Sequence, residues 1–296
     1  MKKQINIFLC MMIIIILPNP AGLVLNSNLQ SIKNSSFDDY APEWKLDNSW
    51  NYYINRFQIN FSISNALMAL DSYIDNLTVE MIGYSGSSYK LGLSGNIKGV
   101  FEYDSGEGMV LKGNLLFTKF SGNSFIRKND LANEKTQIII KGIVLLTEHT
   151  FRIPLPIPLP LTITVNMIQN NPRSFVDFPL YDGKHGLINE TIISLDIKIE
   201  SIILRIFSFF FEEIPYSIYY KDTYIFPMLN YSIKTSNITV YAGSFNTYNI
   251  SFSWDLFGSI FYAPLVGNIV KIESVIEVPD QFMVLCIGEL KDYYYQ

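Results

Sequence analysis

From Ser49 to the end of the chain, apolar and polar residues alternate over many short stretches. One stretch is especially regular, with Tyr248, Ile250, Phe252 and Trp254 alternating with Thr247, Asn249, Ser251 and Ser253. Because successive side chains of a β-strand point to opposite faces, this pattern predicts a strand with one buried face and one face in water. Pro264 and Gly267 predict a turn after it, and a further strand is expected over residues 269–278.

The same period of two predicts further strands, separated by turn sequences rich in Gly, Ser and Asn. We expect strands over residues 50–59, 77–84, 89–93, 97–103, 109–118, 137–146 and 191–200, with turns at 85–87, 94–96 and 104–108. A break in the alternation near Arg56 indicates a β-bulge. One strand and its turn take about ten residues, which favours an antiparallel sheet over alternating strands and helices.

Some segments do not follow this pattern. Residues 64–73 have the composition of a short helix capped by Ser64, and residues 120–135 are polar enough to predict a loop. Residues 202–211 are almost continuously apolar, which fits a buried strand or a helix; their Ile and Phe content favours the strand. Residues 154–160 alternate proline with aliphatic residues, which excludes a central strand. We expect a stiff connector or an edge there, and a binding lip is the alternative.

The N-terminus has the organisation of a secretory signal. Lys2 and Lys3 precede an apolar run over residues 5–17, and residues 18–22 are small or turn-forming. The run is shorter than the ~20 residues that span a bilayer, so a cleaved signal is favoured over a retained anchor, and both over a buried helix. We assign residues 1–22 to a signal peptide or membrane anchor, 23–47 to a polar tether, 48–290 to the β domain and 291–296 to a tail.

Composition narrows the class of protein. Hydrophobic residues make up 49% of the chain, aromatic residues 15% and charged residues 17%, which excludes a disordered chain. A single run approaches membrane length, which excludes a polytopic membrane protein. The net charge of −5, without a basic stripe, excludes nucleic acid as a partner. Cys286 lies in an apolar string and is expected to be a buried, inert thiol rather than part of a disulfide framework.

Several segments resemble a known group of proteins. Residues 240–250 and 261–273 resemble the Gly-x-Phe-x-x-Tyr-x-Ile and Tyr-x-Pro-x-Val-Gly-x-Val-Lys motifs of exported, notably archaeal, TapB-like β-sheet proteins. Residues 48–52 are similar to the opening Gly-x-x-Trp-x-Tyr strand of that group, with Asn48 in place of glycine, and residues 178–184 to its Phe-Pro-Leu…Gly-Lys segment. The resemblance implies a mainly β fold: one large curved antiparallel sheet, a half-barrel like that of LolA-type lipoprotein carriers, with one or few short helices. It transfers no catalytic residue.

Candidate catalytic groups are few. Asp177, Asp182 and His185 are close in sequence, but nothing in the pattern places them on a regular element, so a solvated turn is favoured over a metal site. Glu212 and Glu213 are adjacent, and in a strand they would point to opposite faces. The chain has no Gly-x-Ser-x-Gly, phosphate-loop or His-Glu-x-x-His motif. We expect no enzyme activity, no metal and no cofactor.

Asn-x-Ser/Thr sequons are more frequent than the Asn, Ser and Thr content of the chain predicts by chance. They begin at Asn34, Asn60, Asn76, Asn189, Asn230, Asn237 and Asn249. In an exported chain such sequons mark surface positions that can carry glycans. We therefore expect a glycosylated protein at the cell surface.

The aromatic content exceeds what a single core face needs, which suggests a hollow lined by apolar residues. The expected function is to hold an apolar or amphipathic ligand, such as a lipid, with Tyr248, Ile250, Phe252 and Trp254 as lining residues. The alternative for these four is that they pack the core. The alternative function is a glycosylated structural or adhesive envelope component, with other envelope proteins as partners and no small-molecule site. Membrane contact is expected only through the N-terminal segment, if it is retained.

Overall fold

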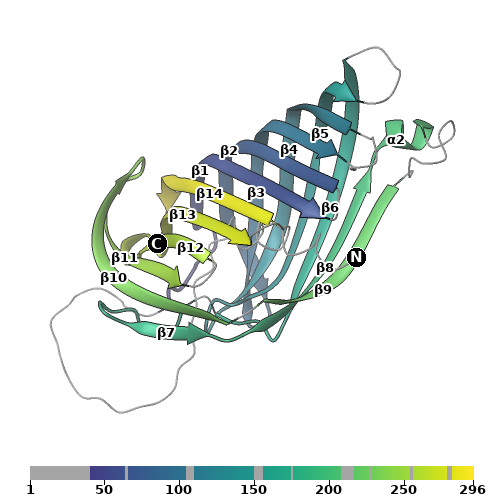
Figure 1. The fold of residues 1–296 in the computed structure, drawn as a ribbon. Coiled ribbons are helices and arrows are strands. Elements are labelled where there is room, and N and C mark those ends of the chain that lie inside the picture. Colours follow the sequence, from purple (N-terminus) through teal and green to yellow (C-terminus); the bar gives the residue numbers. More distant parts are fainter. Residues whose placement is uncertain are drawn as a thin grey trace, which may run out of the picture.

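The computed structural model describes residues 41–63, 66–104, 110–149, 156–174, 176–207, 217–226, 228–253, 256–278 and 282–296 (Figure 1). The strands are β1 (Ser49–Ile63), β2 (Ala66–Ser85), β3 (Ser88–Asp104), β4 (Val110–Arg127), β5 (Asn133–His149), β6 (Ile157–Asn170), β7 (His185–Ile188), β8 (Thr191–Glu200), β9 (Ser217–Phe226), β10 (Leu229–Val240), β11 (Gly243–Ser253), β12 (Leu256–Ala263), β13 (Asn268–Val278) and β14 (Phe282–Tyr294). The described residues also contain a short helix, α2 (Ile202–Phe207), and a 3-10 turn, η1 (Pro264–Val266).

All fourteen strands belong to one antiparallel sheet, in the order β7-β10-β11-β12-β13-β14-β1-β2-β3-β4-β5-β6-β8-β9. The pairing of β1 with β14 places the two ends of the described chain in the middle of the sheet. The register shifts between Ile54 and Arg56, so the predicted bulge is confirmed. The strands predicted at residues 191–200 and 269–278 are confirmed as β8 and β13, and the turn at Pro264 and Gly267 is confirmed as well.

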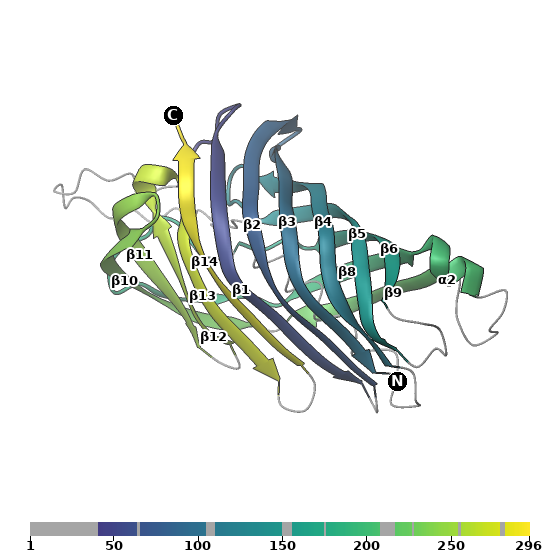
Figure 2. The ribbon, with the colours of Figure 1, turned by 90° about the horizontal axis from the view of Figure 1, so that it is seen from above.

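The sheet is strongly curved and not closed, and Figures 1 and 2 show the strands wrapping around a common interior. One core cluster contains buried residues from β1–β8 and from β10–β14, so strands from distant parts of the sheet turn the same face inward. We call this the inner face and the opposite one the outer face. The predicted mainly β fold, with one large curved antiparallel sheet, is confirmed.

The two edges of the sheet meet at one corner. Ile188 of β7 lies opposite Leu229 of β10, and three residues further along each strand Thr191 of β8 lies opposite Phe226 of β9. The two ladders therefore follow one register, and only two residues interrupt each strand between them. Because the register is shared, β7–β8 pairs with β9–β10 as one continuous two-stranded ribbon, which we call the bent ribbon. Its bend contributes to the curvature of the sheet around the interior.

The helix predicted at residues 64–73 is wrong. Within that segment, Leu67 to Tyr73 belong to β2 and pair with β3, and Leu67 and Leu70 also lie opposite β1 residues. An isolated helix of about ten residues is marginal in water, whereas two flanking strands satisfy every backbone group of a central strand. The preceding Ser64 and Asn65 lie outside the described residues.

The turn predicted at residues 94–96 is also wrong, and the loop predicted at 120–135 is confirmed only at residues 128–132, between β4 and β5. Residues 94–96 lie inside β3, where a Cβ on Gly95 would sit 2.6 Å from the ring of Phe120 in β4. Gly95 therefore makes room for a buried aromatic ring rather than forming a turn. Residues 120–127 are polar and yet form the end of β4, because a polar residue on their inner face, Ser124, is buried and hydrogen-bonded to Thr136 of β5. The turn predicted at 104–108 falls largely outside the described residues.

The prediction of a connector or an edge at the proline-rich residues 154–160 is confirmed in part. Residues 157–160 extend β6 and pair with β5, but the ladder with β8 begins only at Thr162. The prolines thus lie where one side of the strand is unpaired, as expected for residues without an N–H group. Residues 202–207 form α2 rather than the favoured strand, and residues 208–211 lie outside the described part of the chain. Among the described residues, no helix is long and apolar enough to cross a membrane.

The close approach of Gly95 and Phe120 gives a test of the β3–β4 packing. We expect Gly95→Ala to lower the free energy of unfolding by about 2 kcal/mol, because the new methyl group must displace a buried ring. Gly83→Ala is the control, since a Cβ at Gly83 meets nothing within 4 Å. Urea denaturation measures both. Phe120→Leu should restore part of the loss in the Gly95→Ala background, and equal effects of the two glycine substitutions would contradict this packing.

Candidate ligand-binding surface

The structure places three of the four predicted lining residues, Tyr248, Ile250 and Phe252, on the inner face, with unequal exposure. Ile250 lies opposite Ile233 and is 2% exposed, so it belongs to the core. Tyr248 and Phe252 are half-buried and pack against the edge of that core. Trp254 lies outside the described residues. Ile250 therefore packs the core, as the alternative interpretation expects, and contact of Tyr248 and Phe252 with a ligand stays a prediction.

The polar residues on the opposite face of the same strand are less exposed to solvent than predicted. Thr247 is buried and exchanges hydrogen bonds with Ser236, while Asn249 and Ser251 are half-buried. The cause is the tip of the β10–β11 hairpin, which bends onto β14. There Phe245 packs edge-on against Tyr293, with ring centroids 5.9 Å apart, and the Ala242 N–H donates to Leu290.

A second set of half-buried apolar residues lies on the inner face of β5, β6 and β8. Ile163 lies directly opposite Ile140 on one side and Ile199 on the other. All three are half-buried and pack against the edge of the main core. Leu115 and Leu161 extend this surface toward a separate buried cluster, and we call the five residues the inner strip.

The separate cluster lies at the end of the sheet where α2 is found. It contains Leu111, Val144, Leu146, Ile157 and Leu159, and Ile203 of α2 packs against it. The inner strip therefore lies between two buried clusters and is itself only partly covered. The sequence does not reveal this strip, because alternation shows which residues face inward and not how fully each one is covered.

A segment between β6 and β7 crosses the interior, and we call its described residues, 171–174 and 176–184, the strap. Val176, Phe178 and Leu180 alternate along it and are buried in the main core. The Phe178 ring packs edge-on against Tyr262 of β12, with centroids 5.8 Å apart. The strap thus connects the end of β6 with strands on the other side of the curved sheet. The period-two alternation of its apolar residues is the sequence signal that could have revealed it.

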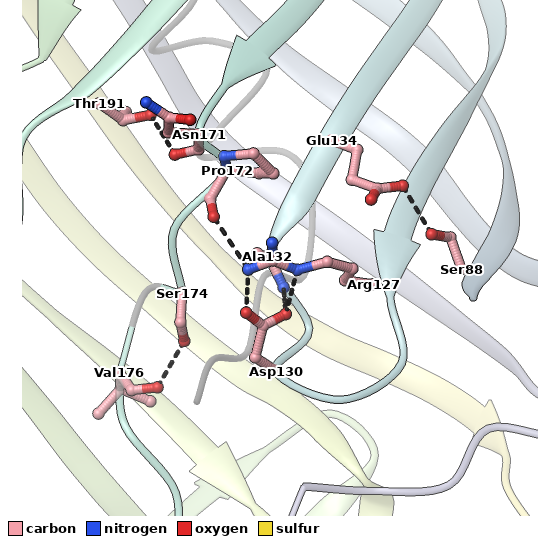
Figure 3. A network of polar contacts seen from close by, with 10 residues as sticks. All are labelled: Ser88, Arg127, Asp130, Ala132, Glu134, Asn171, Pro172, Ser174, Val176 and Thr191. Carbon is pink, nitrogen blue, oxygen red and sulfur yellow. Dashed lines mark hydrogen bonds and ion pairs between the residues drawn. The ribbon is translucent and has the colours of Figure 1, made fainter. Parts of the chain in front are cut away.

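Polar contacts hold the first part of the strap (Figure 3). Arg127 forms an ion pair with Asp130, whose side chain is 3% exposed, and also donates to the Pro172 carbonyl at 2.9 Å. The Thr191 hydroxyl donates to the Asn171 carbonyl at 3.0 Å. The turn between β4 and β5 and the start of β8 therefore fix where the strap begins.

The second part of the strap contains the residues considered for a metal site. The Asp177 carboxylate accepts from the Tyr231 hydroxyl at 3.3 Å, and burial raises the pKa of Tyr231 to about 12. The Lys184 ammonium donates to the Asp177 and Pro179 carbonyls; burial lowers the pKa of Lys184, against the opposing effect of Asp177.

The other two candidate ligands point elsewhere. The Thr235 backbone N–H and hydroxyl both donate to Asp182 and lower the pKa of that carboxyl. His185 is exposed in β7, opposite Ser232. Within the described ranges, no three His, Cys, Asp or Glu side chains gather as they would around a metal ion. Glu212 and Glu213 lie outside the described residues.

Aromatic residues fill the end of the interior near η1. The indole N–H groups of Trp44 and Trp50 donate to the carbonyls of Gly267 and Val266, at 2.9 and 3.0 Å. The Tyr52 hydroxyl donates to the Ile269 carbonyl at 2.9 Å. Two of the segments that resemble TapB-like proteins, residues 48–52 and 261–273, therefore meet here in a structural role.

The described sequons lie on the surface. Asn249 is half-buried, Asn34 lies outside the described residues, and the others are exposed: Asn60, Asn76, Asn189, Asn230 and Asn237. Their side chains are accessible to modification, with one local constraint, because the Asn76 amide oxygen accepts from Lys291 at 2.8 Å.

Comparisons with models of known protein families, with curated proteins and with solved structures found no match to this chain. The resemblance to TapB-like proteins stays a prediction.

The first test of this geometry concerns Cys286. It is fully buried, and burial raises the pKa of its thiol to about 12. Since a thiolate is the reactive form, we expect no alkylation of Cys286 by iodoacetamide up to pH 9 in the folded protein, and rapid alkylation in denaturant. Peptide mass spectrometry separates this residue from Cys10. Fast labelling of Cys286 in the folded state would show that this part of β14 is open.

The second test concerns the ion pair that positions the strap. Arg127→Met leaves the buried Asp130 carboxylate with only the Ala132 N–H as a donor and removes the donor to Pro172, so we expect a loss of about 2 kcal/mol in the free energy of unfolding. The strap should also be cleaved faster in limited proteolysis. Arg127→Met combined with Asp130→Asn removes both charges and should be less destabilising than the single substitution. Unchanged cleavage within residues 171–184 would rule out Arg127 as an anchor of the strap.

Proposed function

We propose that this chain is an exported, non-enzymatic protein that holds an apolar or amphipathic ligand, such as a lipid, against the inner face of its curved sheet. The observation that carries the proposal is the inner strip. Ile140, Ile163 and Ile199 form an unbroken aliphatic row on three neighbouring strands, and each is only half-buried.

The energetics of such a surface favour a ligand with an aliphatic part. Covering a half-buried isoleucine recovers about 1 kcal/mol of apolar transfer free energy. Several such residues in one row can offset the cost of immobilising a small ligand and give moderate affinity. The residues of the strip are all aliphatic, so the acyl chain of a lipid or a comparable hydrocarbon suits it. Tyr248 and Phe252 offer a second half-buried apolar surface on the same face.

Export and glycosylation are supported by separate features. The basic and then apolar N-terminal sequence is that of a secretory signal, and the fold needs no disulfide framework, since its one described cysteine is a buried free thiol. Five sequons expose their asparagine side chains in the folded chain. These features suit a glycoprotein at a cell surface.

The exposed sequons also favour the second candidate function, a glycosylated structural or adhesive component of the envelope. Such a protein would use its outer surface, and its inner face would serve only as a core. The two functions differ in whether the inner strip contacts a ligand.

The test is native mass spectrometry of the gently purified protein, followed by titration with a fluorescent fatty acid. We expect a co-purifying lipid mass and a saturable fluorescence change. Replacing Ile163 and Ile199 together by Thr keeps the β-branched shape but makes the strip more polar. This double variant should bind the probe roughly tenfold more weakly.

The matched control makes the same change on the outer face of the same strands. Ile168 of β6 and Ile192 of β8 are exposed there, so replacing both by Thr should leave probe affinity unchanged. If no lipid mass is found and the probe does not bind, the envelope-component function is favoured. Equal losses in the two double variants would show that the probe does not use the inner strip.

A further inference from the structure

Three locally unfavourable features coincide on the outer face, where β3, β4 and β5 lie side by side (Figure 2). They are an exposed aromatic side chain, a left-handed backbone conformation and an uncompensated pair of like charges. We call the residues involved the basic patch: Phe117 with Lys98, Lys119 and Lys141.

Phe117 combines two of these features. Its φ is +51°, a conformation that costs a residue with a Cβ free energy and is rare for bulky side chains. Its side chain is 84% exposed, the highest value among the large apolar residues described. It lies in a bulge of β4, because the pairing with β5 shifts between Leu116 and Lys119. The bulge therefore directs a large apolar group into solvent in the middle of a sheet.

The lysines surround this bulge. Lys119 lies directly opposite Lys141, and like charges in that position destabilise a pair of strands. No ion pair or hydrogen bond to a described residue compensates either of them. Lys98, on the adjacent strand, lies 3.9 Å from Asp75 and near the ring of Tyr73. Three exposed lysines thus gather in one place on a chain whose net charge is −5.

Strained and unpaired features that the fold does not need are typical of functional surfaces. We infer that the basic patch docks the protein onto an anionic lipid surface, with the lysines near the headgroups and Phe117 inserted at the interface. Cationic side chains beside an exposed aromatic residue are the usual composition of such interfacial contacts. This contact is separate from the inner strip and would be a second one besides any retained N-terminal segment.

The residue types favour lipid over a protein partner. Lysine is depleted in protein–protein interfaces, where arginine is preferred for its fixed fork of donors. Mobile headgroups can pair with flexible lysines in any arrangement, including two that lie side by side. Phe117 also protrudes from the outer face of the curved sheet, so the contacted surface has to yield around it. An acidic protein segment is the alternative, and the experiment below separates the two.

The experiment measures binding of the full chain to vesicles of phosphatidylcholine alone or with phosphatidylglycerol, at low and at physiological salt. Binding through the apolar N-terminal segment is shared by all variants, so each variant is compared with the wild type on both vesicles. Each lysine near an anionic surface strengthens binding by about fivefold, so the double variant Lys119→Gln/Lys141→Gln should lose roughly 25-fold on anionic vesicles. It should be unchanged on neutral vesicles, and salt should weaken the wild type more than this variant.

The control removes the same charge elsewhere. Lys45 precedes β1 and Lys234 lies in β10; both are exposed and neither belongs to the basic patch, so Lys45→Gln/Lys234→Gln should lose much less binding. A local probe is provided by Phe117→Trp, whose fluorescence should shift to shorter wavelength and be quenched by brominated lipids in anionic vesicles. Tyr241→Trp, at another exposed aromatic position, should show neither change. Unchanged thermal unfolding confirms that each variant is folded.

Three results would overturn the inference. The first is equal loss in the two double-lysine variants, which would indicate a non-specific charge effect. The second is an unquenched Phe117→Trp variant on bound vesicles, which would place the patch away from the bilayer. The third is tight binding of soluble polyglutamate that depends on Lys119 and Lys141, together with no preference for anionic vesicles; that result would assign the patch to an acidic protein segment.

Discussion

The structure depends on one constraint: the sheet has an apolar face and, apart from the six-residue α2, no described helical layer to cover it. A sheet in that situation can bury the face only by curling around it and by placing connecting segments against it. The pairing of β1 with β14 joins the two ends of the described chain in the middle of the sheet. The bent ribbon of β7–β8 and β9–β10 then brings the outer strands to one corner. Curvature is therefore the way the core is formed.

The same constraint explains why the interior is covered unevenly. Near η1, Trp44, Trp50 and Tyr52 fill the space and donate hydrogen bonds to the carbonyls of Gly267, Val266 and Ile269. The strap adds Phe178 and its neighbours to the middle of the core. Toward α2 the residues of the inner strip stay half-buried. The apolar surface proposed to hold a ligand is thus the part of a curled sheet that the chain itself leaves incompletely covered.

Much of the fold could be predicted from the sequence, and the errors have a common cause. Period-two alternation located β8, β11 and β13, and the irregularity at Arg56 located a bulge. The errors concern residues whose roles depend on a partner far along the chain. From the sequence, Gly95 is predicted to lie in a turn, but in the structure it lies against the ring of Phe120. Thr247 is predicted to be exposed to water, but it is buried where the hairpin tip bends onto β14. For the candidate site, alternation predicted the facing of Tyr248, Ile250 and Phe252, but neither the strap nor the inner strip.

By itself the sequence determined that most of this chain is strand and which side chains share a face, because the geometry of a strand fixes side-chain direction at every second residue. Tertiary structure decided how far each face is covered, since coverage depends on curvature, register and the path of the connections. Those properties come from contacts between residues distant in sequence, such as Ile163 with Ile199 or Phe178 with Tyr262. The positions of the inner strip and of the basic patch are therefore properties of the folded sheet alone.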